Sequence, residues 1–265
     1  MRTLTRLTAL MIVIVLMGCT TVPVTGRRSF AILPSSELAS MSIESYKKVL
    51  DEATLSEDQA QIDFVVSVGE RLARATETYL QLNDFSTENL AWEFNVIKED
   101  DTVNAWAMPG GKIAVYTGIL PIAQDADGLA TVLGHEIGHA IAAHGNERMS
   151  QAMMVQLGGV ALSTATRNQP GKTSNIFMQS YGAASSVGLL LPYSRLHETE
   201  ADTIGLTLMA MAGYDPRAAI PFWERMNASG GNRPPQFLST HPAPATRIQN
   251  IREHLPEAMA VYAEE

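Results

Sequence analysis

Two histidines and a glutamate within residues 130–144 have the spacing of a metal site carried by one helix. His135 and His139 are four residues apart, so on an α-helix their side chains share one face. Their imidazole nitrogens can then reach a single Zn²⁺ at roughly 2.0–2.1 Å. Glu136 lies about 100° further round the helix, where its carboxylate can take a proton from a water molecule beside the metal. The three residues predict a hydrolytic zinc centre.

The pattern His-Glu-x-x-His is typical of zinc peptidases, and its surroundings favour that interpretation. The segment is apolar on nearly all sides, which predicts a buried helix. Gly128, Gly138 and Ala142 lie near the histidine face, and we expect them to leave room for a metal ion and its water. The alternative is a buried helix with two structural histidines. His144 falls off the metal-facing side and is expected to be an ordinary helix-end residue.

A catalytic zinc usually has three protein ligands, and the third is sought in the cluster at residues 197–202. On a helix, Glu198 falls inside the apolar arc and Asp202 lies one turn later at its edge, whereas Glu200 faces the other way. A buried carboxylate needs a positive partner, which zinc would supply for Glu198. Asp202 could accept a hydrogen bond from the outer N–H of a ligand histidine. The alternative is a solvated acidic helix start.

The beginning of the chain has the pattern of a bacterial lipoprotein signal peptide. Residues 1–18 combine a basic start with an apolar stretch that is too short for an ordinary membrane span. A Leu-Met-Gly-Cys motif ends at Cys19, which we expect to be lipidated and to begin the mature chain, with residues 19–34 as a tether. Because Thr20 and Thr21 follow, with no aspartate to favour inner-membrane retention, we expect anchorage in the outer membrane, facing the periplasm. The alternative is a signal peptide cut elsewhere and an incidental cysteine.

Charge and cysteine content restrict the partners of the chain. The net charge is −9, which argues against nucleic acid binding and gives no attraction to an anionic membrane surface. Membrane attachment would therefore depend on the lipid at Cys19. Because this cysteine is the only one, the chain can form no internal disulfide and has no other thiolate to offer a metal. The third zinc ligand must be histidine, glutamate or aspartate.

The periodicity of apolar residues predicts an α+β fold that is mainly helical, with one domain over residues 35–265. A small antiparallel sheet is expected directly before the metal helix, which begins near Asp125. The polar segment 167–175 is expected to be a loop, and the Ser/Gly/Ala-rich segment 177–191 a close-packed helix or an apolar contact surface. The predicted helices cover 35–50, 57–80, 146–164, 196–212, 216–227 and 242–255, and the predicted strands cover 92–97, 104–108 and 112–116.

Taken together, HEIGHA at 135–140 and ETEAD at 198–202 make the chain resemble the HtpX / CAAX-prenyl-protease / Oma-type family of zinc metallopeptidases. The resemblance covers roughly residues 60–255 and extends to NAWAMPGG at 104–111 and STHP at 239–242. It implies a zincin-like metallopeptidase domain. The chain lacks the several membrane spans of some members and is more similar to the periplasmic lipoprotein members.

The resemblance also implies roles for individual residues. His135, His139 and Glu198 would bind one zinc ion per chain, Glu136 would be the general base, and His241 would stabilise the tetrahedral oxyanion. The strand that begins at Asn104 would be a sheet edge that pairs with an extended substrate, through Asn104, Ala105, Trp106 and Ala107. An edge strand has free N–H and C=O groups for such pairing. From the residues alone, an internal hairpin and an ordinary loop histidine stay as alternatives.

These observations predict a zinc-dependent endopeptidase of the bacterial cell envelope. Its substrates would be extended or misfolded envelope proteins, so its partners would be unfolded or misassembled proteins and, through the lipid, a membrane. The alternative is a lipid-anchored, chaperone-like binding module with a catalytically silent peptidase fold. That module would hold unfolded proteins at the edge strand and at segment 177–191. The presence of all three ligands and of the base favours the peptidase.

Overall fold

The computed structural model describes residues 19–151, 195–229, 235, 237–238, 241 and 246–264. Within these residues the fold is α+β and mainly helical, which confirms the predicted class. The predicted signal peptide and the segments 167–175 and 177–191 lie outside the described residues. No helix in the described part of the chain combines the length and the apolarity that crossing a membrane requires.

The helices and strands follow the predicted order closely. The strands are β1 (Cys19–Thr21), β2 (Arg28–Phe30), β3 (Glu93–Ile97), β4 (Ala105–Met108) and β5 (Lys112–Tyr116). The helices are α2 (Ser35–Glu52), α3 (Gln59–Leu82), η1 (Thr117–Ile119), α4 (Leu120–Ala123), α5 (Ala126–Ile141), η2 (Pro216–Ala218), α8 (Ala219–Ala228) and α10 (Arg247–Tyr262), and two further helical segments cover 144–151 and 195–211. The metal helix α5 begins where Asp125 caps it, because the Asp125 side chain accepts a hydrogen bond from Gly128 N at 2.8 Å.

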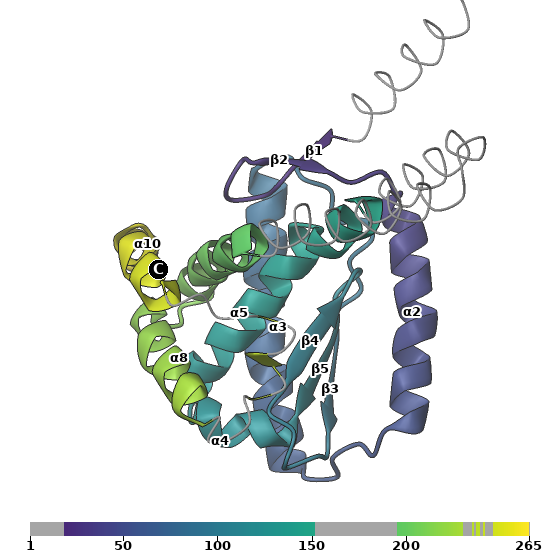
Figure 1. Ribbon diagram of the computed structural model, residues 1–265, viewed down its shortest axis with the longest axis vertical. Helices are drawn as coiled ribbons and strands as arrows, with labels where there is room; N and C mark the ends of the chain where they lie inside the picture. The colour runs from purple at the N-terminus through teal and green to yellow at the C-terminus, as the bar shows by residue number, and fades with distance from the viewer. Residues whose placement is uncertain are drawn as a thin grey trace, which may run out of the picture.

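A three-stranded sheet lies at the centre of the described structure, between helices on both faces (Figure 1). Helix α2 covers one face, where the Tyr46 hydroxyl donates a hydrogen bond to Ile113 O at 2.6 Å. Helices α3 and α5 cover the other face, and α5 lies next to β4. The C-terminal helices α8 and α10 pack on the side of α5 away from the sheet. The metal helix is therefore buried between two layers.

The sheet is mixed, so the predicted antiparallel sheet is wrong in one pairing. Strands β4 and β5 form an antiparallel hairpin, but β5 pairs with β3 in parallel, in the order β3-β5-β4. The hairpin turns at Gly110 and Gly111, whose φ angles of 83° and 80° suit glycine. Because β5 inserts between its two predecessors, β4 stays at the edge of the sheet, beside α5.

The predicted tether is folded in its described part. Strands β1 and β2 pair in an antiparallel hairpin, and Val22 and Ser29 are buried. We call residues 19–34 the N-terminal arm. The arm continues along the helix at 144–151, where Asn146 Nδ2 donates to Leu33 O at 2.8 Å. The lipidation of Cys19 stays a prediction.

Glycines allow α5 and the helix at 195–211 to approach closely. A Cβ atom on Gly138 would lie 2.8 Å from Ala201 O, and one on Gly205 would lie 2.9 Å from His135 N. The expectation that Gly138 leaves room for a metal ion is therefore wrong, because the backbone of the second helix fills that space. Gly128 likewise faces Ala123 O. The contact between the helices is what brings Glu198 to the histidines.

Candidate metal centre

Helix α5 places its two histidines side by side in the interior of the protein. The side chain of His135 is 1% exposed and that of His139 is 10% exposed. Their Nε2 atoms lie 3.0 Å apart, as expected from the four-residue spacing on one helix face. The Nε2 atoms of both rings thus face the same point, and their Nδ1 atoms contact other residues.

Glu198 reaches this point from the helix at 195–211. Its Oε2 lies 3.4 Å from His135 Nε2, and its Oε1 lies 3.4 Å from His139 Nε2. Burial would raise the pKa of the Glu198 carboxyl, but the two histidines outweigh burial and hold that pKa well below its usual range. The group that faces the rings is therefore a carboxylate.

The donor set fits a divalent cation such as Zn²⁺. Two imidazole nitrogens and one carboxylate form the ligand type of catalytic zinc sites. Glu198 Oε2 is buried and makes no hydrogen bond within the described part of the chain; its neighbours there are His135 Nε2 at 3.4 Å and Arg247 Nη1 at 3.6 Å. Burial and Arg247 oppose a positive charge on His135, but Asp202 and Glu198 outweigh them and raise the pKa of its imidazole. A metal ion at the three atoms would give Glu198 Oε2 a direct partner.

Glu136 lies between the metal centre and the edge strand. Its Oε2 accepts a hydrogen bond from the Ala107 N–H at 3.2 Å, and its Oε1 makes no hydrogen bond within the described residues. Burial raises the pKa of the Glu136 carboxyl to about 7. A carboxyl with a pKa near neutrality can both accept and return a proton, which suits a general base.

His241 lies beside both ligand histidines and faces the second carboxylate oxygen of Glu136. Its Nε2 is 3.5 Å from Glu136 Oε1, and its ring stacks on Phe237 at a centroid distance of 4.5 Å. The ligand atoms of His241 and of the three expected ligands all lie within 4.8 Å of one another. The structure thus places His241 where it could contact either a metal ion or a reacting carbonyl. The expected role in oxyanion stabilisation stays a prediction.

Asp202 lies behind His135 and has a cationic partner that sequence reasoning missed. Its Oδ1 is 2.8 Å from His135 Nδ1 and 2.7 Å from Arg247 Nη2. The buried Arg247 guanidinium comes from α10, lies 3.5 Å over the Trp223 ring and has its Nη1 3.6 Å from Glu198. From the sequence, zinc is the expected positive partner of Glu198 and a ligand histidine is the expected partner of Asp202; Arg247 is a cation beside both. Because Arg247 is on a separate helix, helical periodicity alone could not identify it.

His144 and Glu200 form a second buried cluster. His144 lies at a helix end, as expected, at the start of the helix at 144–151, but it is 0% exposed. Glu200 is 4% exposed, so the expectation that it faces outward is wrong. The outward face of the helix at 195–211 is covered by the N-terminal arm, whose Arg27 contacts Glu200 at 2.7 Å. The sequence contained a sign of this burial, because titratable residues occupy both faces of the helix at 197–202.

The expected substrate-binding residues lie in or directly before β4, the edge strand of the sheet in the described part of the chain. Asn104 is buried just before β4, and its O accepts a hydrogen bond from Tyr116 N at 3.0 Å. Hydrogen-bonded and non-hydrogen-bonded residues alternate along an antiparallel pair of strands. The backbone N–H and C=O groups of Trp106 therefore point toward β5, and those of Ala105 and Ala107 point away from it. The Ala107 N–H has Glu136 as its partner. The binding role of these residues stays a prediction.

A cavity of about 550 Å³ lies beside the metal centre. His139 and Ala107 line it, together with apolar side chains of the N-terminal arm and of the helices and loops that follow. Its apolar lining includes Ile32, Leu33, Leu38, Leu80, Phe85 and Leu90. This cavity connects the metal-binding helix and the edge strand, so it is placed to receive part of a peptide.

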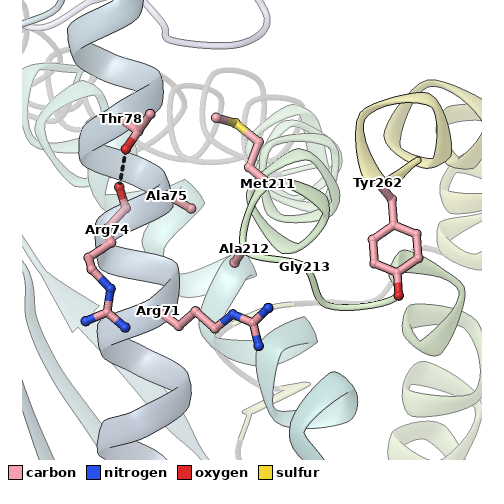
Figure 2. Close-up of a pocket in the computed structure, with 8 residues that line it drawn as sticks. All are labelled: Arg71, Arg74, Ala75, Thr78, Met211, Ala212, Gly213 and Tyr262. Carbon is pink, nitrogen blue, oxygen red and sulfur yellow. Dashed lines mark hydrogen bonds between the residues drawn. The ribbon is translucent and has the colours of Figure 1, made fainter. Parts of the chain in front are cut away.

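A second groove of about 650 Å³ lies between α3, the helix at 195–211 and α10, and contains none of the expected site residues (Figure 2). Arg71 extends toward Gly213 and contacts the Tyr214 ring at 4.8 Å, whereas Arg74 points away from it. Because the two guanidinium groups do not converge, this groove does not form an anion site.

Comparisons with known proteins agree with this geometry. The chain is similar to the mitochondrial metalloendopeptidase OMA1 of Schizosaccharomyces pombe, with 38% identity over 239 residues, 89% of this chain and 66% of the relative. It is also similar to the putative beta-barrel assembly-enhancing protease of Vibrio cholerae, with 29% identity over 79% of this chain and 42% of the relative. Metalloprotease YcaL of Escherichia coli is 29% identical over 58% of each chain. The model of peptidase family M48 matches residues 67–255. The predicted family and metallopeptidase class are confirmed, and the chain belongs to peptidase family M48.

Proposed function

We propose that the protein is a zinc-dependent endopeptidase that hydrolyses peptide bonds in extended or unfolded chains. The observation that carries this proposal is the convergence of His135, His139 and Glu198 from two helices, with Glu136 beside them. Family membership supports the same reaction class. Zinc is the metal that this donor set and the family favour.

The residues of the chain supply the proton transfers and the positioning. Bound zinc would polarise the scissile carbonyl and lower the pKa of a water molecule toward about 7. Glu136 takes a proton from that water and returns it to the leaving amine, and the Ala107 N–H keeps the carboxylate oriented. His241 is placed to donate a hydrogen bond where negative charge develops on the carbonyl oxygen.

The substrate is proposed to bind as an added strand at β4. The outward N–H and C=O groups of Ala105 and the outward C=O group of Ala107 can pair with any extended backbone, so this mode tolerates many sequences. A peptide in that position would pass Glu136 and the metal centre, and its side chains could enter the cavity lined by His139. An enzyme of this kind would act on unfolded rather than folded proteins.

The apolar lining of this cavity predicts a preference for large apolar residues next to the scissile bond. Leu33→Asp should lower the ratio of kcat/KM for leucine-containing over lysine-containing peptides by about tenfold or more, because a negative charge in the cavity lining disfavours an apolar side chain and favours a cationic one. The backbone of Leu33 would stay bound to Asn146. The measurement is cleavage-site mapping on a peptide library. Leu82→Asp, at an exposed leucine, is the matched control, and an unchanged ratio in Leu33→Asp would contradict the assignment.

Metal removal tests the proposed reaction directly. Purified protein should bind about one equivalent of zinc and cleave a denatured model protein, and a strong chelator should reduce cleavage to background. Added zinc should restore it, since the ligands belong to a folded site. Less than about a tenth of an equivalent of zinc in fully folded protein would favour the chaperone-like alternative. Cleavage that persists after complete metal removal would refute the mechanism.

We also propose that the natural substrates are unfolded or misassembled envelope proteins and that a lipid on Cys19 anchors the enzyme at the outer membrane, facing the periplasm. The leader pattern at residues 1–18 supports the anchor. One relative is named a putative beta-barrel assembly-enhancing protease, which supports a role in envelope quality control. The edge-strand mode of binding suits the same class of substrate.

A further inference from the structure

We propose that His144 and Glu200 are positioning residues for zinc binding, and that Arg27 of the N-terminal arm holds them in place. Together they would fix His139 in the tautomer that can bind the metal. This inference rests on the proposed function, because it concerns the same metal centre. It assigns a task to a buried cluster that the proposed reaction does not otherwise use.

A series of short side-chain contacts connects the ligand His139 to the N-terminal arm. His139 Nδ1 lies 2.9 Å from His144 Nδ1, and His144 Nε2 lies 2.9 Å from Glu200 Oε2. Arg27 Nε donates to the same Glu200 oxygen at 2.7 Å. These contacts lie in the interior, because His144 and Glu200 are fully or almost fully buried and the His139 side chain is 10% exposed.

The direction of each hydrogen bond in this series follows from the protonation state of Glu200. One Glu200 oxygen contacts the Thr25 hydroxyl and the other accepts from the positively charged Arg27 guanidinium, so we take Glu200 as an ionised carboxylate that only accepts. His144 must therefore carry its proton on Nε2, and its Nδ1 is left as an acceptor. The neighbouring Nδ1 of His139 must then be the donor. With its proton on Nδ1, His139 keeps a free lone pair on Nε2, which is the atom that faces His135 and Glu198.

The two ligand histidines are thus supported in two different ways. Asp202 contacts His135 Nδ1 directly at 2.8 Å, whereas Glu200 acts on His139 through the intervening His144 ring. Outer hydrogen bonds of this kind set the tautomer and orientation of metal-binding histidines. A single helix, at 195–211, supplies the ligand Glu198 and both outer carboxylates, one on each side.

Arg27 connects this support to the arm. Its guanidinium contacts Glu200 and also makes two hydrogen bonds to Glu147, at 3.1 and 2.8 Å. Without that cation the two buried carboxylates would lie close together uncompensated. Arg27 precedes residue 67, where the family match begins, so the arm adds this contact from outside the matched region.

Zinc affinity, measured by competition with a chromophoric chelator, tests the inference without relying on turnover. His144→Phe keeps an aromatic ring in place but can neither accept a hydrogen bond from His139 nor donate one to Glu200, and it should weaken zinc binding by about 10- to 100-fold. His144→Gln carries an acceptor and a donor at similar spacing and should recover most of that loss. Arg27→Met should weaken zinc binding by a smaller factor, roughly threefold to tenfold, because it acts through Glu200.

Val65→Ala is the control for general loss of stability. Val65 is buried on α3 and is not among the residues whose hydrogen bonds build the His144 cluster, so this variant should lower the melting temperature and leave zinc affinity unchanged. The inference is overturned if His144→Phe binds zinc as tightly as wild type, or if His144→Gln is as weak as His144→Phe. An equal loss in Val65→Ala would overturn it as well. If wild-type protein binds zinc and cleaves a denatured model protein, any of these three results overturns this inference alone. If wild-type protein binds no zinc, the proposed function is overturned too.

Discussion

Replacing Glu136 by glutamine should reduce peptide hydrolysis by about 10³-fold or more while zinc stays bound. General acid–base catalysis contributes roughly 10²–10⁴-fold, and here a single group handles both proton transfers. The amide of glutamine has nearly the same shape but cannot accept the proton. Because Glu136 is not among the expected ligands, the metal centre should be preserved.

The measurements for this variant are kcat on a denatured model protein and the zinc content of the purified protein. Glu257→Gln, at an exposed glutamate of α10, makes the same chemical change far from the site and should match wild type in both. A Glu136→Gln protein that cleaves at the wild-type rate would show that another group takes the proton. Loss of zinc in Glu136→Gln would instead place this glutamate among the ligands.

Features encoded over a few residues could be predicted from the sequence. The four-residue spacing of His135 and His139 sets a shared helix face without any tertiary information. The Pro-Gly-Gly turn at 109–111 and the short apolar run after it located β5 at its observed bounds, and Asp125 marked the start of α5, which its capping hydrogen bond confirms. In these cases the local geometry of the backbone decides the outcome, so a single stretch of sequence contains the answer.

Contacts between distant elements could not be predicted in the same way. Periodicity separates an apolar face from a polar one, but it does not say what covers the polar face. Glu200 was therefore expected to face outward, although the N-terminal arm buries it with Arg27. Arg247 was missed for the same reason, and the parallel pairing of β3 with β5 depends on how the hairpin inserts rather than on either strand.

The metal ligand on the second helix should be the residue whose change costs the most zinc affinity. Glu198→Gln removes the negative charge that faces both histidines and leaves an amide, which is a weaker ligand in a buried site. Loss of an outer hydrogen bond costs about 10- to 100-fold, so loss of this ligand charge should cost on the order of 10³-fold or more.

Glu198→Gln and Glu136→Gln form a matched pair, because both change one atom of a buried glutamate in the same centre. Chelator competition should show weak zinc binding in Glu198→Gln and near wild-type binding in Glu136→Gln, although both lose turnover. Excess zinc should restore some cleavage to Glu198→Gln but none to Glu136→Gln, because only the second lacks the proton acceptor. A Glu198→Gln protein that keeps its zinc against a chelator as well as wild type does would mean that the ion is held elsewhere. The assignment of this helix to the metal centre would then be wrong.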